Sequence, residues 1–550
     1  MSNSYSSDTH QVINQPEPLS DYNAYTSDRV LTHYVDRFNG NWGEGRLVQY
    51  GYKVGHELLT AGFDANKFKP EFESHDRFGH RIDQVNYHPA YHQLMSAAIE
   101  AGHHSIPWNE PQPGANVVRA AIEYLHYQAD PGSGCPLTMT FSAVPAIKHQ
   151  ESIAKDWLPK ITANTYDPRN VPFFEKQGLT IGMAMTEKQG GSDVRANTTK
   201  AKPIEKAGAG EVYLLTGHKW FCSAPMCDAF LVLAQTSNGL SCFLLPRWKP
   251  DGRKNTLFIQ RIKNKMGNIS NASSEVEYRN AFAWLIGEEG NGVKTILEMV
   301  SMTRFDCMVG SSALMGLATA QAIHHTSGRD VFGKNLHQQP LMQNVLADLA
   351  IESEAALAIS MRLAHALDNQ DKETEQLLVR LGTAIGKYWI CKRAASHTVE
   401  AMECIGGVAV VEDNVLARLY RESPINAIWE GSGNVQCLDV ARAMLKEAKV
   451  IDTFIAELEK ARSNFPVYDE KLNDLKQQIT EDGIKESQLR QFVEQLALLW
   501  QAATLMNDSE DFIAEAFVNS RLSSERSFMF GALPETTPFE RIIQRARPRI

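Results

Sequence analysis

The segment Ile428-Trp429-Glu430-Gly431-Ser432-Gly433-Asn434 places one carboxylate between a bulky aromatic residue and two glycines. An aromatic neighbour withholds water from a carboxylate and raises its pKa. Glycines allow a backbone to approach a ligand closely. A carboxylate in such surroundings can remove a proton from carbon, so Glu430 is the candidate general base. The alternative is an ordinary helix end that carries a Glu-Gly pair.

Two earlier segments could hold a ligand. The run Met185-Thr186-Glu187-Lys188-Gln189-Gly190-Gly191-Ser192 can present backbone N–H groups to an anion or a polar ring edge. A plain Gly-Gly hairpin is the alternative. The run His218-Lys219-Trp220-Phe221-Cys222-Ser223 carries an aromatic pair that either packs in a core or forms a flat wall for a planar cofactor.

Two later segments have the chemistry of phosphate binding. In Arg329-Asp330-Val331-Phe332-Gly333-Lys334, the arginine can hold a pyrophosphate through a two-pronged contact. The alternative is a helix end with a glycine cap. In Glu403-Cys404-Ile405-Gly406-Gly407, the double glycine can admit a phosphate or a ribose.

The bulk composition limits the classes of protein to which the chain can belong. Its 550 residues predict several domains, and 43% hydrophobic residues suit a globular protein. The net charge of −10 excludes general binding of polyanions by the whole chain. The 8 cysteines form no CxxC pair or Cys/His cluster, so we expect no metal site and reduced thiols in the cytoplasm. No signal peptide and no membrane span is expected.

Residue patterns divide the chain into five segments. Residues 1–40 are polar and turn-rich and are predicted to be an arm. Residues 41–179 show helical spacing, for example over 92–103 and 115–128. Residues 180–287 are predicted to form an antiparallel β domain, with a hairpin at Asn238-Gly239. Residues 288–446 show the spacing of a helical bundle, and 447–550 form a helical extension that includes a helix over 491–506.

Taken together and in this order, the five motifs resemble the acyl-CoA dehydrogenase family of flavoproteins, over about residues 150–445. Three more segments, Asn14–Leu19, Cys135–Phe141 and Arg421–Glu430, are similar to the AidB-type, adaptive-response branch of that family. The resemblance implies an α+β, mostly α, acyl-CoA dehydrogenase-like fold. That fold has an N-terminal helical domain, a middle antiparallel β-barrel-like domain, a C-terminal four-helix-type domain and, here, a helical extension.

The resemblance also implies FAD as the cofactor, held between subunits of a homotetramer. Arg329 and Phe332 would reach the FAD of a neighbouring subunit. Three residues depart from the family pattern, because Cys222, Glu403 and Pro340 stand where threonine, glutamine and glutamine are usual. The implied FAD-binding residues are Met185, Thr186, Gly191, Ser192, Trp220, Phe221, Cys222, Ser223, Arg329, Phe332, Glu403, Gly406, Gly407, Trp429, Ser432 and Asn434.

In the family's chemistry, a base takes the α-proton of an acyl thioester while a β-hydride goes to flavin N5. The resemblance assigns this base to Glu430. Another branch keeps its base just before an arginine in an earlier helix, where this chain has Thr303-Arg304. Threonine cannot serve as that base, so Glu430 remains the candidate. Arg304 is predicted to contact the substrate, which would be a short or branched acyl-CoA.

The AidB-type resemblance further implies binding of double-stranded DNA through the C-terminal extension and resistance to alkylation damage. Residues 451–550 contain 12 Lys and Arg against 17 Asp and Glu, which opposes binding to phosphates. The basic tail 541–549 is either a DNA contact or a solvated, disordered end. The candidate DNA-binding residues are Arg442, Lys446, Arg541, Arg545 and Arg547.

The sequence therefore predicts a cytoplasmic, FAD-containing protein of the AidB type. It would combine low dehydrogenase activity with an alkylation response and association with DNA. One alternative is a genuine acyl-CoA dehydrogenase with no nucleic-acid role. Another is a flavoenzyme that inactivates alkylating agents directly.

Overall fold

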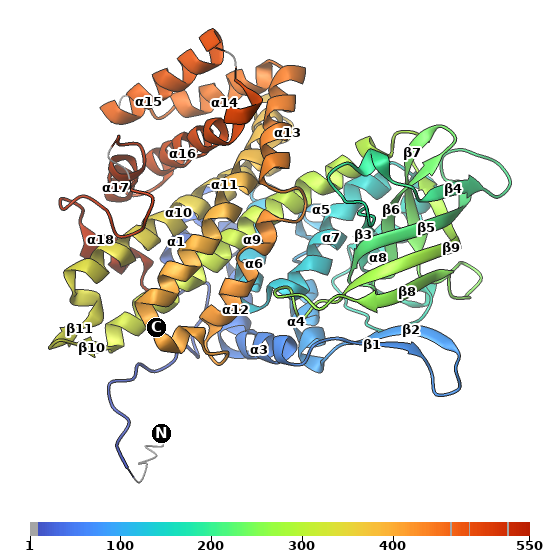
Figure 1. The fold of residues 1–550 in the computed structure, drawn as a ribbon, viewed down its shortest axis with the longest axis horizontal. Helices are drawn as coiled ribbons and strands as arrows, with labels where there is room; N and C mark the ends of the chain where they lie inside the picture. Colours follow the sequence, from blue (N-terminus) through green and yellow to red (C-terminus); the bar gives the residue numbers. More distant parts are fainter. Residues whose placement is uncertain (1–8, 463–464, 483, 525–526) are drawn as a thin grey trace.

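The chain folds into a helical bundle with a barrel-like sheet on one side and a second group of helices on the other (Figure 1). The computed structural model describes residues 9–462, 465–482, 484–524 and 527–550. The predicted fold class, mostly helical with a central β domain, is confirmed. All eight cysteines are free thiols and seven are buried. Over the described ranges, no helix is both long and apolar enough to cross a membrane.

The N-terminal part is mainly helical. The helices predicted over 92–103 and 115–128 correspond to α4 and α6. A hairpin of β1 and β2 was not predicted, although Phe72 and Val85 pair across it and are less exposed than their neighbours. The elements are α1 (Arg29–Arg37), α2 (Glu44–Lys53), α3 (Leu59–Lys67), β1 (Glu71–His75), β2 (Arg81–Asn86), α4 (Pro89–Glu100), α5 (Ile106–Asn109), α6 (Ala115–Ala129), α7 (Pro131–Lys148) and α8 (Glu151–Ile161).

The predicted arm, residues 1–40, contains a helix that the sequence analysis missed. In α1, Leu31, Tyr34 and Val35 are buried, at the spacing of one helical face. Before α1, Asn14 contacts the β10–β11 hairpin of the same chain. The Asn14 amide donates to the Asp330 carbonyl at 2.8 Å, and the Asp330 N–H donates to the Asn14 side chain at 2.7 Å.

The middle part is a seven-stranded sheet in which six strands follow the order β3-β6-β4-β5-β9-β7, β8 pairs with β9, and β7 also pairs with β6. The β domain predicted for this part and its hairpin at Asn238-Gly239 are present. The turn at Asn238 joins β6 to β7, with Thr236 paired to Gly239. Most pairs are antiparallel as predicted, but β3 and β4 each pair with β6 in parallel. The strands are β3 (Ile181–Ala184), β4 (Lys200–Pro203), β5 (Val212–Ser223), β6 (Ala229–Thr236), β7 (Gly239–Pro246), β8 (Leu257–Ile262) and β9 (Ser273–Ile286).

Three long helices form the bundle. A short hairpin, β10–β11, follows the first of them, and a 3-10 turn over Ile425–Ala427 precedes the last helix of this part. The elements are α9 (Gly292–Gly328), β10 (Asp330–Val331), β11 (Lys334–Asn335), α10 (Pro340–Asp368), α11 (Glu373–Ile405), α12 (Val415–Glu422) and α13 (Gly433–Lys446).

The C-terminal extension packs on α10 and α11 (Figure 1). Trp500 is fully buried there, and a Cβ on Gly382 of α11 would lie 2.9 Å from its ring. The disordered tail considered for residues 541–549 is wrong, because 539–546 form a helix whose Ile542 and Ile543 are buried. The helices are α14 (Lys449–Glu459), α15 (Pro466–Gln477), α16 (Leu489–Asp508), α17 (Asp511–Arg521) and α18 (Phe539–Ala546). The proposed boundaries at residues 40, 179, 287 and 446 stay predictions.

Buried ion pairs attach the extension to α10. The Arg521 guanidinium contacts Asp348 and lies 2.9 Å from the Glu352 carboxylate. Arg393 of α11 contacts the other Glu352 oxygen at 2.7 Å. Burial opposes ionisation, but Arg393 and Arg521 outweigh it and lower the pKa of Glu352 to about 2. Glu352 is therefore charged and depends on the two arginines for its stability in the interior.

Replacing Arg521 with methionine should destabilise docking of the extension by about 3 kcal/mol, because two buried carboxylates lose a partner. Urea unfolding and limited proteolysis of residues 449–550 would measure the effect. Lys449→Met is the matched control, since its ion pair with Glu373 is exposed on both sides and should contribute nothing measurable. Equal stability of Arg521→Met and the unmodified protein would contradict the assignment.

Candidate active site

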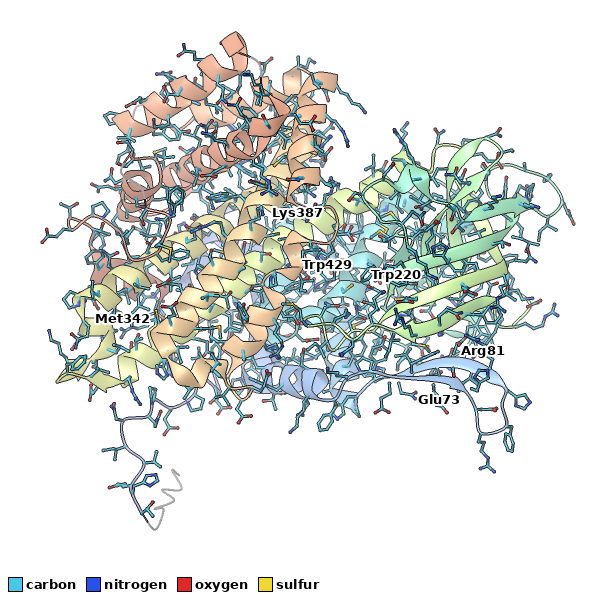
Figure 2. All side chains as sticks on the ribbon, in the orientation of Figure 1. Glu73, Arg81, Trp220, Met342, Lys387 and Trp429 are labelled. Carbon is cyan, nitrogen blue, oxygen red and sulfur yellow. The ribbon has the colours of Figure 1, made fainter. Side chains whose placement is uncertain are left out.

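Glu430 lies in the connection between the Ile425–Ala427 turn and α13. Its backbone is left-handed, with φ +56°, and Gly431 follows at +98°. Glutamate rarely adopts this conformation, so the surroundings must hold it. The ammonium of Lys387, on α11, donates to three backbone carbonyls at 3.0, 2.8 and 2.6 Å, which belong to Asn426, Trp429 and Gly431. Figure 2 shows Lys387 on the bundle just above Trp429. We call this arrangement the Lys387 clamp.

The Glu430 carboxylate accepts a hydrogen bond from the Thr303 hydroxyl at 2.8 Å. Arg304 donates to the Glu430 carbonyl at 2.9 Å and Gln436 to the same carbonyl at 3.2 Å. Burial raises the pKa of Glu430, while the Thr303 hydrogen bond and the charges of Lys387 and Arg304 oppose the rise. Glu430 is therefore a stronger base than an exposed glutamate.

Trp429 is fixed beside this carboxylate by its indole nitrogen, which donates to the Asn426 side chain at 2.8 Å. Asn426 in turn donates to the Ser311 hydroxyl on α9 at 3.2 Å. The ring orientation is thus tied to the bundle and not to the loop alone. Trp429 stays a predicted cofactor-binding residue.

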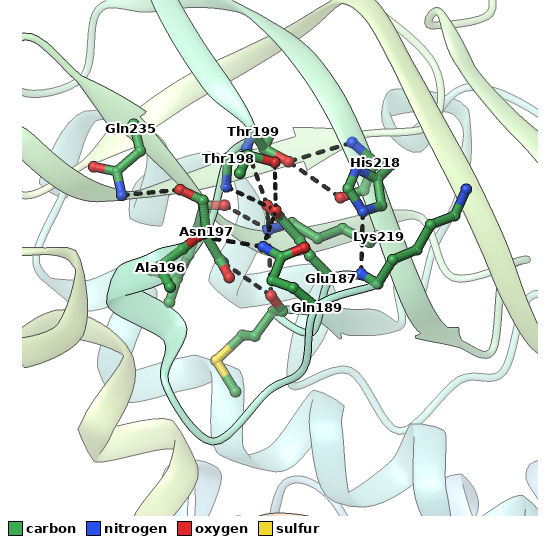
Figure 3. A network of polar contacts seen from close by, with 12 residues as sticks. Glu187, Gln189, Ala196, Asn197, Thr198, Thr199, His218, Lys219 and Gln235 are labelled. Carbon is green, nitrogen blue, oxygen red and sulfur yellow. Dashed lines mark hydrogen bonds and ion pairs between the residues drawn. The ribbon is translucent and has the colours of Figure 1, made fainter.

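A buried carboxylate, Glu187, organises the loop after β3 (Figure 3). It accepts from the Thr198 N–H at 2.7 Å and the Thr199 N–H at 3.0 Å, and it pairs with Lys219 at 3.0 Å. Burial raises the pKa of Glu187, but the hydrogen bonds of Thr199, Thr198 and Gln189 and the charge of Lys219 outweigh burial and hold the pKa well below its usual range. The loop therefore closes around a charged pair inside the protein.

The same loop brings the predicted cofactor residues together. The Trp220 N–H donates to the Thr186 carbonyl at 2.8 Å, which ties β5 to the loop. A Cβ on Gly191 would lie 2.4 Å from the Thr186 hydroxyl, so only glycine allows this approach. Met185 and Thr186 are half-buried, while Gly190 and Ser192 are exposed. The Gly190 N–H donates to the Glu187 carbonyl at 3.0 Å, and binding of a ligand by the Gly191-Ser192 backbone stays a prediction.

Trp220 and Phe221 form an aromatic surface at a bulge. Lys219 pairs with Val276 but Cys222 pairs with Ser274, so β5 has one extra residue here. Phe221 is 46% exposed, and the Lys263 ammonium lies 3.6 Å from the Trp220 ring centre and 4.4 Å from that of Phe221. Aromatic faces beside a cation and open backbone N–H groups fit a planar ring that carries phosphates, which is the chemistry of FAD.

The thiol of Cys222 does not face this surface. Cys222 is fully buried in the apolar core of the β domain, and its carbonyl accepts from the Ser274 hydroxyl at 2.9 Å. The structure of one subunit therefore does not place the Cys222 thiol at the surface where the flavin is predicted to bind. Ser223 is half-buried, with its hydroxyl 3.0 Å from that of Ser273, and offers a hydroxyl near the same place.

Cys135, on α7, lies near both the end of β5 and Glu430. Burial raises the pKa of the Cys135 thiol to about 12, and the charge of Glu430 adds to the rise. The charge of Lys265 and a hydrogen bond with Ser223 oppose it. The thiol therefore lies near both the Glu430 carboxylate and the Ser223 hydroxyl.

The predicted phosphate-binding motifs lie at the other end of the bundle. Arg329 follows α9, whose last residue is 24 positions and roughly 36 Å along the helix from Arg304. Glu403 is 16 positions, roughly 24 Å, beyond Lys387 on α11. Figure 1 shows β10 and β11 far from β5. One chain therefore does not bring these motifs to Glu430, and only a second copy could.

The segment Arg329–Lys334 is not a helix end with a glycine cap, which was the alternative interpretation. It forms the β10–β11 hairpin after α9. Phe332, at its tip, has φ +53° and is 94% exposed. Arg329 donates to the Asn14 carbonyl at 2.8 Å, so it binds the arm of its own chain. Glu403, Gly406 and Gly407 are also exposed. These residues stay candidates for a cofactor held between subunits.

Arg304 is already engaged and was wrongly assigned to substrate. Besides the Glu430 carbonyl, its guanidinium contacts Asp439 at 2.8 Å. It therefore positions the base segment. Asn434 accepts from Arg490 of α16 at 2.8 Å, which ties the start of α13 to the extension, and Ser432 is exposed before it.

Only part of the predicted DNA-binding set is free. Arg442 and Lys446 are exposed on α13. Arg545 is not available, because it binds the Glu354 carboxylate through two hydrogen bonds of 2.8 Å. Arg547 is half-buried, and Arg541 stacks over the Phe512 ring at 4.0 Å. The predicted contribution of Arg545 to DNA binding is therefore wrong.

Several residues of this site were not predicted from sequence. Lys387 stands in the run Ile385-Gly386-Lys387-Tyr388-Trp389, where a lone lysine among apolar residues is the available signal. Glu187 and Lys219 fall inside recognised motifs, but nothing in the spacing showed that they pair. Thr303 was considered only as a failed base, and its hydrogen bond to Glu430 needs the fold.

Comparison with known proteins agrees with this geometry. Residues 14–168 match the family model of the adaptive response protein AidB N-terminal domain. Residues 182–281 and 290–445 match the middle and C-terminal domains of acyl-CoA dehydrogenases. AidB of Escherichia coli (strain K12) is 43% identical over 519 residues, which are 94% of this chain and 95% of that protein.

Two solved structures are similar over most of the chain. The structure of Caenorhabditis elegans ACDH-11 in complex with C11-CoA has a TM-score of 0.83 and 25% identity, and covers 96% of this chain and 94% of that one. An acyl-CoA dehydrogenase of Bacillus anthracis complexed with FAD has a TM-score of 0.64 and 17% identity, covering 89% and 85%, which shows the fold alone.

The Lys219→Met variant should loosen the loop that contains Thr186 and Gly191, because Glu187 would remain buried without its cation. We expect a loss of about 3 kcal/mol of stability and faster hydrogen exchange over residues 185–199. Mass-spectrometric hydrogen exchange would locate the change. Lys200→Met, at an exposed position on the neighbouring strand β4, should leave exchange unaltered; equal protection in the two variants would refute the role of the pair.

Proposed function

Because the chain belongs to the acyl-CoA dehydrogenase family and is similar to AidB over nearly its whole length, we propose that it is an FAD-containing protein of the AidB type. Its site would abstract a proton next to an acyl thioester carbonyl. One observation carries the proposal: Glu430 is a carboxylate of raised pKa, held in a left-handed backbone by the Lys387 clamp. Such strain is retained where the position of a side chain matters.

Binding of FAD would use the open loop and the aromatic surface. The backbone at Gly191 and Ser192, the Thr186 hydroxyl and the faces of Trp220 and Phe221 are the groups available in one subunit. Phe332, Gly406 and Gly407 of a neighbouring subunit would complete the site, which makes a homotetramer the proposed assembly. When bound, FAD supplies an acceptor for the hydride that leaves the β-carbon.

The role of this chain's own residues follows from their contacts. Thr303 donates to one oxygen of Glu430, so the other oxygen can take the α-proton. Arg304 and Gln436 hold the Glu430 carbonyl and thereby set the direction of the side chain. The departure at Glu403 from the glutamine usual in the family supports a low rate.

The alkylation response and DNA binding are proposed on the likeness to AidB and on the exposed cations of α13. Arg442 and Lys446 of several subunits would together contact the phosphates of one DNA duplex. The extension opposes this, with 12 Lys and Arg against 17 Asp and Glu over residues 451–550. A dehydrogenase without a nucleic-acid role is the second candidate, and the engagement of Arg545 by Glu354 favours it.

Glu430→Gln should slow anaerobic reduction of the bound flavin by a short-chain acyl-CoA about 10³-fold, since the amide cannot accept the proton. The loss of flavin absorbance after mixing measures the rate, and the spectrum before mixing shows that FAD is retained. Glu447→Gln, at an exposed position just after α13, is the matched control. An unchanged rate in Glu430→Gln would exclude this glutamate as the base.

The rate in the same assay should rise with pH through the pKa of Glu430, because only the ionised carboxylate accepts a proton. The midpoint should lie above the ordinary value of about 4.3 for glutamate. Thr303→Val should move the midpoint higher still, since it removes a hydrogen bond that stabilises the charged form.

Duplex DNA should be retarded in a gel at low salt and released as salt increases. Changing both Arg442 and Lys446 to glutamine should lower the slope of log affinity against log salt by about 2 per subunit. Lys449→Gln, whose ammonium already binds Glu373, provides the control. Failure of the unmodified protein to shift DNA at about 50 mM salt would remove DNA from the proposed function.

A further inference from the structure

A cavity of about 650 Å³ lies away from Glu430, between α1, the start of α17 and the C-terminal tail. This volume is in the range that small-molecule sites occupy. Arginines dominate one side of it. The lining residues that matter here are Arg29, His33, Phe512, Arg541, Arg545 and Arg549.

The tail is built into this cavity by specific contacts. The Arg549 N–H donates to the Ser27 carbonyl at 3.1 Å, just before α1. Arg545 is held by Glu354 through two hydrogen bonds of 2.8 Å. These contacts bring the guanidinium groups of the tail toward Arg29, the first residue of α1. The N-terminus of α1 itself is occupied, because the Asp28 carboxylate accepts from the Val30 and Leu31 N–H groups at 2.9 Å, so the positive charge of this place comes from the arginines.

Arg29 has unused hydrogen-bonding capacity. Its Nε is buried and, within the described ranges, has no hydrogen-bond partner. Burial, followed by the charges of Arg549 and Arg545, lowers the pKa of Arg29. Like charges are thus gathered around a buried donor. Guanidinium groups arranged in this way match the oxygens of a phosphate or carboxylate.

The carboxylates of the cavity lie mostly elsewhere in it. Burial raises the pKa of Tyr25 to about 12, and Glu44, Asp36 and Asp28 add to the rise, so Glu44 and Asp36 lie near Tyr25. Asp36 is seven residues, roughly 10 Å along α1, from Arg29. Glu510 faces Arg545 at 3.9 Å. The acidic end would repel a long polyanion while leaving the arginine end open to a small one.

We propose that this cavity binds a small phosphate-bearing anion at the guanidinium groups of Arg29 and Arg549. Arg541 stacks on Phe512 at 4.0 Å and offers a cation over an aromatic face at the rim. A nucleotide-sized ligand, with its phosphates at Arg29 and its base at Phe512, is the class that fits both features. The site is separate from the Glu430 site and does not depend on the proposed dehydrogenase chemistry.

Calorimetric titration of the full-length, flavin-loaded protein with inorganic pyrophosphate and with ADP tests the proposal. One saturable site per subunit is expected, with affinity that falls as salt increases. Arg29→Gln and Arg549→Gln should each weaken binding about tenfold. Phe512→Leu should weaken ADP and leave pyrophosphate unchanged. Thermal unfolding of each variant shows whether the fold is intact, and Arg549, in the tail, gives a second variant that does not alter α1.

Arg37→Gln is the matched control, because Arg37 lies on the same helix and pairs with Asp508 outside the cavity. It should bind both probes like the unmodified protein. The proposal is overturned if neither probe saturates below about 10 mM, or if Arg37→Gln weakens binding as much as Arg29→Gln. Displacement of pyrophosphate by duplex DNA at equal phosphate concentration would also overturn it, by assigning the arginines to a polynucleotide.

Discussion

The candidate site depends on one buried ammonium group. Lys387 donates hydrogen bonds to three carbonyls of the segment that carries Glu430, and Gln436 donates to the Glu430 and Gly431 carbonyls of the same segment. Without Lys387, its three carbonyls would lose a charged donor beside a left-handed glutamate. Because Lys387 is on α11 and Thr303 on α9, the two longest helices together fix the direction of the carboxylate. The bundle is thus the support for the chemistry and not only a core.

The length of these helices imposes a second constraint. The predicted phosphate-binding residues lie at the ends of α9 and α11, roughly 36 Å along α9 from Arg304 and roughly 24 Å along α11 from Lys387. A rigid helix cannot bend back over such a distance, so one subunit cannot assemble all the motifs. The nearly fully exposed Phe332 at the hairpin tip has no neighbour of its own chain to account for it. Assembly of copies is the physical solution that the proposed function requires.

Two arginines of the extension form ion pairs that stabilise the fold, so they are not free to bind a ligand. Arg521 and Arg545 are used on buried carboxylates of α10, which fixes α17 and α18 to the bundle. A basic tail in the sequence is therefore not a basic surface in the protein. Cationic side chains gather at two other places. Two are exposed on α13, and a group of arginines lines the cavity at the start of α1. These two places differ in shape, so they suit different anions.

The sequence alone determined the fold class, the strands of the β domain, the main helices and the role assigned to Glu430. These follow from local periodicity, from turn chemistry such as Asn238-Gly239 and from motifs that resemble one family. Only the tertiary structure decided which charges pair. In the structure, Arg304 donates to the Glu430 carbonyl, Cys222 is buried in the core of the β domain, and Arg545 binds Glu354. The physical reason is that a pairing between groups far apart in the chain leaves no periodic trace, because it depends on where helices and strands meet.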